Sequence, residues 1–410
     1  MPGPLSHIRV LDLSRVLAAP WTGQNLADLG AEVIKVERPG KGDDSRAFGP
    51  PWLKDAQGND TVESAYFAAA NRGKKSITVD LSKSEGQQIV RELADRCDVL
   101  LENYKYGDLP RYGLGYEDLK KTNPRLIYCS VTGFGHTGPY RERPGYDFMI
   151  QGMGGLMSIT GERDDLPGGG PQRVGVPIVD MMTGMYASIA VCAAIAHRAE
   201  TGVGQHLDLA LLDTQVAFLA NQAMNYLATG EVPQRLGNAH PNIVPYQTFR
   251  TADGAIILAC GNDNLFNKFC AVAGCPELVR DPRFVTNGKR VENRVAITEL
   301  LADVFSKRTT RDWVSALETA GVPNGPINNI EQVFEEPQVV ARGMRIELPH
   351  PTAGKVPLVA SPMRFSATAL EHKLAPPTLG QHTDEILKDV LGMDAAAVAK
   401  LRAAKVLGDS

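Results

Sequence analysis

The first third of the chain alternates between strand-like and helix-like segments, and this alternation restricts the fold more than any other feature. Short apolar runs such as IRVLDLS at 8–14 and DVLLENY at 98–104 are typical of buried strands. Amphipathic segments of helical length, such as residues 84–97, separate them. Parallel strands need crossover connections of this length. We therefore predict an α/β fold with a large Rossmann-like parallel sheet. The expected strands cover 8–14, 31–37, 76–81, 98–104, 126–134 and 206–212.

The pattern changes after Gly230. Residues 246–261 have the pattern of a β-hairpin that turns at Asp253-Gly254, and amphipathic helical segments follow them. With 410 residues the chain is long for a single core. The sequence therefore predicts a smaller α+β domain over 230–328, after which strand patterns return. Two helices are expected near the end of the chain, at about 383–392 and 394–403.

The longest apolar run is VGVPIVDMMTGMYASIAVCAAIA at 174–196. It is long enough to span a bilayer, but Pro177, Asp180 and several small polar residues favour a buried helix over about 180–198. The segment 213–229 is predicted as a second long helix. We therefore expect a soluble protein without a membrane partner.

Composition and missing motifs argue against several classes of protein. The net charge of −4 argues against broad nucleic-acid binding. The six cysteines include no CxxC pair, which argues against a zinc site or a disulfide framework and for a reducing compartment. The N-terminus lacks the pattern of a signal peptide. We predict a cytoplasmic protein, or a mitochondrial one if a transit peptide has been removed. Neither GxGxxG nor a Walker A motif is present, so nicotinamide and P-loop chemistry are not expected.

Basic and amide side chains stand at the ends of several expected strands. Arg38 follows IKVE, residues 71–75 precede SITVDL, 103–105 follow DVLLE, and Arg111 lies further on. The carboxyl ends of parallel strands face the ligand crevice of such folds. Each of these residues alone is more simply a solvated surface charge, but their recurrence favours a site for a phosphorylated ligand.

Asp180 is the one carboxylate near the start of the apolar run, and two interpretations are open. Asp is a favoured N-cap, and its charge suits the positive end of a helix. The same helix end favours the ionised form, which would keep the carboxylate available as a nucleophile. His240 and His136 lie in loop-like segments and could contact substrate or only their neighbours. The glycines of 166–175 could form a flexible loop or a mobile lid.

Nearly end to end, the chain resembles the family III CoA-transferases. The resemblance is carried by RVLDLSRVLAAPWTGQNLADLGAEVIKVERPGKGDDSR, NRGKKSITVDL, VLLENYKYGDLPRYGLGYEDL, GYDFMIQGMGGLMSITG and VGVPIVDMMTGMYA. Within the family it is most similar to the succinyl-CoA-using dicarboxylate branch, as GNAHPNIVPYQTFRTADG and GVPNGPINN indicate. The resemblance implies an interlocked homodimer of ring-like protomers. It also implies that 1–229 and 329–410 together build the large domain, with the small domain between them.

The resemblance also implies a reaction. The nucleophile of the family is an Asp at the position of Asp180, which would form an aspartyl anhydride and then an aspartyl-CoA thioester. CoA would pass from an acyl-CoA donor, expected to be succinyl-CoA, to a carboxylic acid, expected to be a dicarboxylate. One thioester replaces another, so neither a metal nor a redox cofactor is expected.

The CoA contacts of the family match a set of positions that overlaps the strand ends. Leu17 stands where formyl-CoA transferases often carry Gln, and their glycine tetrad is missing from 230–265, so formyl or oxalyl specificity is not expected. Arg46 or Arg173 could pair with the distal carboxylate of the acceptor. The matching CoA positions are Leu17, Ala18, Arg38, Ala70, Asn71, Arg72, Gly73, Asn103, Tyr104, Lys105 and Arg111.

Two other functions fit the same resemblance. A 2-methylacyl-CoA racemase needs two bases beside an α-carbon, and Tyr146 stands where racemases carry His. A non-catalytic acyl-CoA-binding protein is the other alternative, and the retained Asp180 in its full motif argues against it.

Overall fold

The computed structural model of the chain describes residues 3–408, and its internal contacts divide the chain into two compact units. The first unit comprises the chain up to Gly155, Val174–Ala223, and the chain from Pro337 onward. The second unit comprises Leu156–Arg173 and Met224–Glu336. The domain boundaries that the sequence predicts, at 230 and 328, remain a prediction, because the two units are defined by internal contacts alone.

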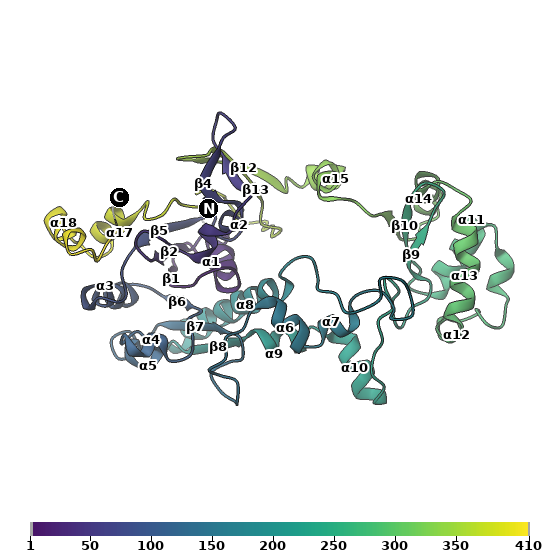
Figure 1. Ribbon diagram of the computed structural model, residues 1–410, viewed down its shortest axis with the longest axis horizontal. Coiled ribbons are helices and arrows are strands. Elements are labelled where there is room, and N and C mark those ends of the chain that lie inside the picture. The colour runs from purple at the N-terminus through teal and green to yellow at the C-terminus, as the bar shows by residue number, and fades with distance from the viewer. Residues whose placement is uncertain (1–2, 409–410) are drawn as a thin grey trace. The chain divides into compact units, whose positions relative to one another are not determined.

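Six parallel strands form the sheet of the first unit, in the order β5-β2-β1-β6-β7-β8 (Figure 1). The predicted α/β class with a large parallel sheet is thus confirmed. The strand order reverses between β1 and β6, and such a switch point leaves a crevice at the carboxyl ends of the strands. The strands are β1 (Arg9–Asp12), β2 (Glu32–Glu37), β5 (Lys74–Thr78), β6 (Val99–Glu102), β7 (Ile127–Thr132) and β8 (His206–Ala210).

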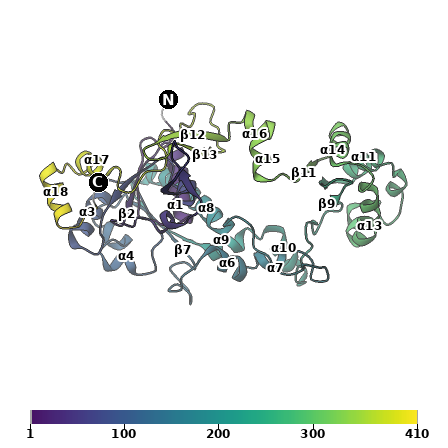
Figure 2. The same ribbon diagram turned by 45° about the horizontal axis from the view of Figure 1, so that its top comes forward.

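Helices cover both faces of this sheet, which explains why its strands are apolar on both sides. On one face, Leu11, Leu100 and Tyr128 of the strands pack with Leu93 and Ile386 of the helices. Both helices expected at the C-terminal end are present, and α17 and α18 lie beside α3 on this face (Figure 2). The helices of this face are α3 (Ser84–Asp95), α4 (Asp108–Arg111), α5 (Tyr116–Leu119), α17 (Thr383–Asp389) and α18 (Ala395–Ala403).

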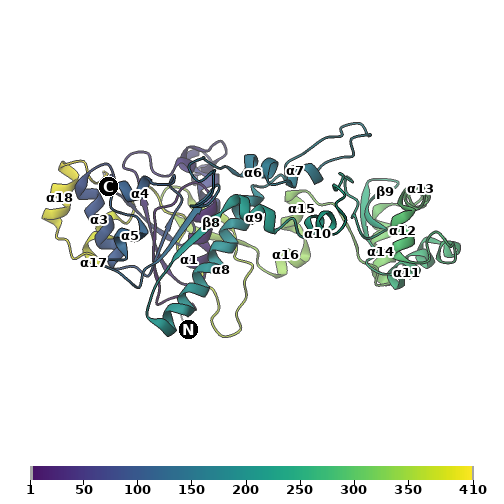
Figure 3. The same ribbon diagram turned by 90° about the horizontal axis from the view of Figure 1, so that it is seen from below.

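On the other face, α1 (Ala18–Asp28) packs along α8 (Ile178–Thr201), as Figure 3 shows. The two helices approach closely, because a Cβ atom on Gly184 of α8 would lie 2.6 Å from the carbonyl oxygen of Ala18. The hydroxyl of Thr22 donates to the carbonyl of Gly184 at 3.1 Å. Within residues 3–408, α8 alone is long and apolar enough to cross a membrane. Here its inner face packs in the core, as the sequence predicts.

The segment 213–229 is not one helix, so that prediction is wrong. The chain forms α9 (Leu211–Ala217) and α10 (Ala220–Thr229) instead. Ala220 has a φ of 47°. A residue in this left-handed region cannot continue a right-handed helix, so the helix ends before it and a second one starts.

The second unit contains a three-stranded antiparallel sheet in the order β11-β10-β9. The predicted hairpin is present, and its strands pair on either side of Asp253-Gly254. Its core is aromatic: the Phe305 ring stacks on Phe249 at a centroid distance of 4.6 Å and lies 4.7 Å from Trp313. The elements of this unit are α7 (Leu156–Ile159), β9 (Tyr246–Arg250), β10 (Ala255–Ala259), α11 (Asp263–Ala273), η2 (Pro276–Val279), α12 (Asn287–Glu292), α13 (Arg294–Phe305), α14 (Thr310–Thr319), β11 (Asn324–Pro326) and α15 (Ile330–Glu335).

Two antiparallel hairpins also belong to the first unit. The strand patterns after residue 328 form one of them, which stands apart from the parallel sheet. The hairpins are β3 (Trp52–Lys54) with β4 (Asp60–Ser64), and β12 (Arg345–His350) with β13 (Gly354–Val359). The remaining elements are η1 (Asp44–Ala47), α2 (Ala65–Ala70), α6 (Asp147–Met153) and α16 (Pro337–Ala341).

Candidate active site

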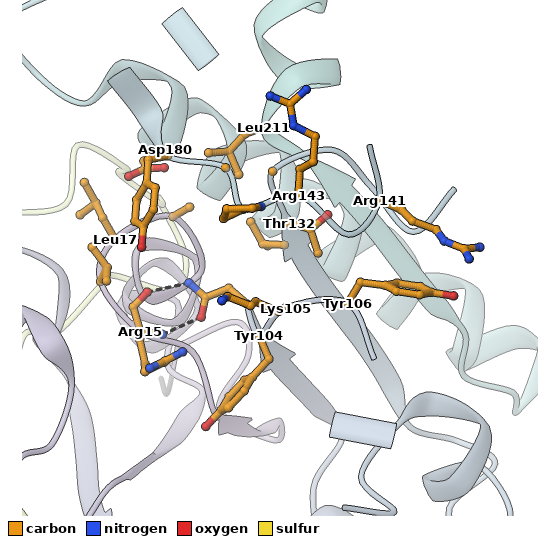
Figure 4. Close-up of a pocket in the computed structure, with 18 of the residues that line it drawn as sticks. Arg15, Leu17, Tyr104, Lys105, Tyr106, Thr132, Arg141, Arg143, Asp180 and Leu211 are labelled. Carbon is orange, nitrogen blue, oxygen red and sulfur yellow. Dashed lines mark hydrogen bonds between the residues drawn. The ribbon is translucent and has the colours of Figure 1, made fainter. Parts of the chain in front are cut away.

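A cavity opens at the strand-order switch of the first unit (Figure 4). The segments that leave β1 and β6, residues 15–18 and 103–106, line it together with residues 141–146 and Asp180. This is the edge of the sheet at which the sequence predicts a ligand site. Six of the sequence-predicted site residues line this one cavity: Leu17, Ala18, Asn103, Tyr104, Lys105 and Asp180.

Asp180 lies in the first turn of α8 without being its cap. The helix begins at Ile178 after the N-cap residue Pro177, so Asp180 is its third residue. The backbone N–H groups of Val179 and Asp180 donate to Oδ2 of Asp147, at 2.8 and 3.3 Å. The capping interpretation of Asp180 is therefore wrong, because Asp147 supplies the carboxylate that the free N–H groups of this helix end require.

Asp147 is itself fixed by its neighbours. It is buried, and its Oδ1 accepts a hydrogen bond from Nε2 of Gln151 at 2.6 Å. Oε1 of Gln151 in turn accepts the N–H of Val174 at 2.9 Å. This run of hydrogen bonds ties α6 to the segment that enters α8, and so fixes the backbone that carries Asp180.

Burial, and after it the charge of Asp147, raises the pKa of Asp180 to about 7. The expectation that the helix end would favour the ionised form is wrong, because Asp147 occupies that end and desolvation favours the neutral acid. Near neutral pH both the neutral and the ionised form of this carboxyl group are therefore populated. Tyr66 of α2 lies nearby: burial, and after it the charge of Asp180, raises the pKa of its hydroxyl.

The loop after β1 is held in a strained conformation. Val16 has a φ of 69°, which a β-branched residue rarely adopts. Its N–H donates to both carboxylate oxygens of Asp43, at 3.0 and 3.2 Å. Asn103 holds Arg15 on both sides, accepting its N–H at 2.8 Å and donating to its carbonyl at 2.6 Å (dashed lines in Figure 4). Strain that the surroundings maintain in this way is typical of functional sites, and here it sets the position of Leu17.

Buried ion pairs support this loop. Lys35 Nζ lies 2.9 Å from Asp43, and Lys74 Nζ lies 2.9 Å from Asp12, with all four side chains inaccessible to solvent. Burial acts to raise the pKa of Asp43, but the Lys35 ammonium and several hydrogen bonds hold that pKa well below its usual range. The carboxylate that holds Val16 is therefore ionised at neutral pH.

Cationic side chains give the cavity a means to bind an anion. Arg38 lines an adjoining cleft together with Tyr104 and Tyr112, and its guanidinium pairs with Asp44. Lys105 is exposed and makes no ion pair with any residue in the described part of the chain. Such an arrangement suits phosphate or carboxylate groups. The cationic residues of the cavity itself are Arg15, Lys105, Arg141 and Arg143.

Five predicted CoA-contact residues lie outside both the cavity and the cleft. Arg72 is buried, pairs with Asp28 at 2.6 Å and donates to the carbonyl of Val359 at 2.6 Å. The N–H of Gly73 donates to the carbonyl of Leu374 at 2.9 Å. Here these groups connect α1 and β5 to the C-terminal segment. The five residues are Ala70, Asn71, Arg72, Gly73 and Arg111, the last of which is exposed and pairs with Asp108.

Other candidates from the sequence are dispersed. Arg46 lies largely buried between Glu37 and Glu63, where its guanidinium holds two carboxylates of the fold. Arg173 and His240 belong to the second unit, and His136 lines a different cavity of the first unit. Within residues 3–408, no group of three or more His, Cys, Asp or Glu side chains could hold a metal ion.

Several residues of the site were missed by sequence reasoning. Arg15 directly follows a buried strand, which is the signal that identified Asn103, so it could have been found. Asp147, Arg143 and Tyr66 carry no such signal, because their proximity to Asp180 arises only when α6, the 141–146 segment and α2 assemble around α8.

Comparison with known proteins yields a consistent group. The sequence model of CoA-transferase family III matches residues 5–383. The chain is 49% identical over 387 residues to the succinate–glutarate CoA-transferase of Agrobacterium fabrum (strain C58). This alignment covers 94% of this chain and 96% of that protein. It is 45% identical over 404 residues to the succinyl-CoA:glutarate CoA-transferase of Homo sapiens. That alignment covers 98% of this chain and 90% of the human protein.

Among solved structures, a CAIB/BAIF family protein from Brucella suis is similar over nearly the whole chain. The TM-score is 0.82 and the sequence identity 50%, and the alignment covers 95% of this chain and 100% of that one.

Proposed function

This chain belongs to CoA-transferase family III and is an enzyme of the CoA-transferase class, and from that premise we propose that it transfers CoA from succinyl-CoA to glutarate or a closely related dicarboxylate. The observation that supports this most directly is identity of 49% and 45%, over most of the chain, to two proteins named for succinate or succinyl-CoA and glutarate.

In the proposed reaction, Asp180 is the nucleophile. Its carboxylate attacks the thioester carbonyl of succinyl-CoA, and CoA leaves as a thiolate, giving a mixed aspartyl–succinyl anhydride. The thiolate attacks the aspartyl carbonyl, which yields an aspartyl-CoA thioester and free succinate. Glutarate then attacks that thioester and releases the thiolate. The thiolate attacks the glutaryl carbonyl of the new anhydride, giving glutaryl-CoA and regenerating Asp180.

The surroundings of Asp180 suit such a nucleophile. With a pKa of about 7, its carboxylate is more basic than an ordinary Asp yet is still populated at neutral pH. Burial also limits the water that would hydrolyse an anhydride. The first N–H groups of α1 have no partner within their own helix, and Ala18 lines the cavity. We assign its backbone N–H to the developing oxyanion.

The proposed CoA site follows the cations at the carboxyl ends of the strands. Leu17, Ala18 and the 103–105 segment lie against the acyl and pantetheine portions, while Arg38 in the adjoining cleft pairs with a phosphate. We also assign Arg15 and Arg143, which line the cavity, to the CoA site. The predicted contacts at 70–73 and Arg111 remain predictions.

The racemase alternative receives no support from the site. Tyr146 lines the cavity at the position where a racemase needs a histidine base, and 70% of its surface is exposed. A phenol is a poor proton acceptor near neutral pH. The non-catalytic alternative conflicts with the named activities of the relatives.

We also propose that the enzyme is a homodimer in a reducing compartment such as the cytoplasm. The outer face of α8 exposes Met185, Tyr186 and Ile189, and contiguous apolar side chains of this kind mark protein interfaces. The six cysteines include no CxxC pair, and scattered cysteines of this kind are typical of proteins from a reducing compartment.

The direct test incubates the enzyme with succinyl-CoA and glutarate and separates the CoA thioesters by chromatography. We expect glutaryl-CoA and succinate in equal amounts, and Asp180→Asn should reduce transfer by at least about a thousandfold while CoA still binds. Oxalate and mesaconate serve as comparison acceptors, and α-proton exchange in 2-methylacyl-CoA tests for racemase activity. No new thioester with any dicarboxylate, or full activity of Asp180→Asn, would contradict the proposal.

A further inference from the structure

A second cavity of the first unit lies beside the proposed CoA site. Its volume is about 380 Å³, and it shares the wall formed by Tyr104, Lys105 and Tyr106 with the first cavity. Glu102, the last residue of β6, lines this second cavity directly before that wall, and His206 of β8 lines it too. The proposed reaction uses neither of these two titratable residues.

Hydrogen bonds connect the wall to His206 across three neighbouring strands. Glu102 is only 4% exposed, and its Oε2 accepts the backbone N–H of Tyr104 at 2.8 Å. Ser130, on β7, stands directly opposite Glu102 in the pairing of the two strands, and its hydroxyl interacts with the same carboxyl group and lowers its pKa. Oγ of Ser130 also lies 2.9 Å from Nε2 of His206. A single path therefore runs from the Tyr104 backbone through Glu102 and Ser130 to an imidazole in the second cavity.

Burial shifts the pKa of both titratable groups on this path toward the neutral form, and the neighbouring charges modify each shift. Burial raises the pKa of Glu102 to about 7; Asp208 and Asp108 raise it further, whereas the bonds from Ser130 and Tyr104 oppose the rise. Burial, and after it His136, lowers the pKa of His206, while Asp208 and Glu117 oppose that shift. The other titratable groups that line the cavity are Tyr104, Lys105, Tyr106, Tyr116, Asp118, Tyr128 and His136.

The path can transfer a proton without leaving a charge on His206. When Glu102 gives its proton to Ser130, the Ser130 hydroxyl passes its own proton to Nε2 of His206. Nδ1 then releases its proton to water in the cavity, so the imidazole changes tautomer and stays neutral. Nδ1 forms no hydrogen bond with any residue between 3 and 408, so no protein partner blocks this release.

We propose that Glu102 is a positioning residue for CoA binding. Its ionised carboxylate holds the Tyr104 N–H, and with it the wall of Tyr104, Lys105 and Tyr106, and it exchanges its proton with the second cavity through Ser130 and His206. This inference rests on the proposed function, because it takes 103–105 as part of the CoA site. A hydrogen bond to an ionised carboxylate is stronger than one to a neutral acid. The wall is therefore held more firmly, and CoA binds more tightly, at pH 8 than at pH 6.

The test measures the Kd of CoA by titration calorimetry from pH 6 to pH 8, for the wild type and for Glu102→Gln. Gln keeps an oxygen that accepts the Tyr104 N–H but cannot ionise. Because the phosphates of CoA also titrate in this range, the signal is the difference between the two proteins. We expect the wild type to gain about fivefold more affinity than the variant over this range. An identical pH dependence in both proteins would overturn the proposal.

Two further variants separate this role from a merely structural one. Ser130→Ala removes a bond that lowers the pKa of Glu102, so the affinity step should move to higher pH; an unmoved step contradicts the path. Glu92→Gln, at a carboxylate of α3 that lines neither cavity, should keep the wild-type profile. If Glu102→Gln does not fold, as thermal melting would show, Ser130→Ala provides the deciding measurement.

The same experiments separate this inference from the proposed function. CoA binding with the expected pH step but without transfer to any acceptor would overturn the function and support the inference. Normal transfer with no difference between wild type and Glu102→Gln would overturn the inference alone. A protein that does not bind CoA would overturn both.

Discussion

The two carboxylates at the start of α8, Asp147 and Asp180, have different surroundings. Asp147 accepts hydrogen bonds from the N–H groups of Val179 and Asp180 and from the Gln151 amide, so its charge is well solvated by the protein. Asp180 is largely buried beside that charge, and its pKa rises. When two neighbouring acids have environments that push their pKa values apart, the two often have distinct catalytic roles. We accordingly assign Asp147 to positioning and Asp180 to attack.

This assignment predicts the pH dependence of the transfer rate. Only the ionised form of Asp180 attacks, so the rate should rise as the pH passes through about 7 and level off above it. Asp147→Asn keeps an oxygen for the Val179 N–H but removes the negative charge, so the rise should move about one pH unit lower. Rates with saturating succinyl-CoA and glutarate across this range give the measurement. Glu142→Gln removes another carboxylate of the cavity lining and serves as the control, with no expected shift.

An unchanged profile in Asp147→Asn would show that burial alone sets the pKa of Asp180. A rise that moves to higher pH would contradict the electrostatic argument altogether, because removing a like charge cannot favour the neutral acid.

Among the elements, the contact between α1 and α8 connects the fold to the site. Ala18 begins α1 and Asp180 lies in the first turn of α8, and both line the same cavity. The separation of the two helices is set at Gly184, where a Cβ atom would lie 2.6 Å from a backbone oxygen and 3.0 Å from Cβ of Trp21. A side chain at this position therefore has to push the helices apart.

Gly184→Ala should consequently impair both folding and transfer. We expect a loss of about 1–3 kcal/mol in the free energy of unfolding, from overpacking, and a fall in kcat because Asp180 moves away from the loop after β1. Thermal melting and the transfer assay provide the measurements. Gly288→Ala is the matched control, since Gly288 lies in α12 and a Cβ atom added there would have no neighbouring atom within 4 Å. An unchanged melting temperature in Gly184→Ala would mean that α1 and α8 tolerate a wider separation.

The helices and strands also show how much of the structure local sequence patterns can predict. The parallel sheet was predictable because its signals are local in the sequence. Each buried strand is a short apolar run, and each crossover helix shows the helical spacing of its apolar residues. The strand ends then located Asn103 and Lys105. The position of Arg72 was not predictable, because its partners Asp28 and Val359 lie 44 and 287 residues away along the chain.

The break between α9 and α10 has a similar origin. Nothing in 213–229 signals a stop, since the segment contains neither Gly nor Pro before Gly230. The left-handed backbone at Ala220 is not one that Ala prefers by itself. Tertiary structure here outweighs local propensity. The same holds at the start of α8, where the N–H of Val179 donates to Asp147, a residue 32 positions earlier in the chain.

At the scale of the whole molecule, the outer face of α8 remains to be accounted for. Its inner residues pack against the sheet, while Met185, Tyr186 and Ile189 are exposed by 40%, 41% and 61%. Phe148 and Val216, on the neighbouring helices α6 and α9, are also more than half exposed. Large apolar side chains gathered on adjoining elements favour association with another protein surface. A symmetric contact between two copies would cover the same patch on both.

The homodimer proposal can therefore be tested through Ile189. Light scattering after size exclusion should give the wild type twice the 44.3 kDa chain mass. Ile189→Glu places a charge in the proposed interface, where an unpaired buried charge is costly, so this variant should dissociate at concentrations at which the wild type remains dimeric. Val62→Glu is the control, since Val62 is 82% exposed on the β4 hairpin strand, away from α8. A monomeric wild type would refute the dimer. A dimer equally stable in Ile189→Glu would place its interface elsewhere than on α8.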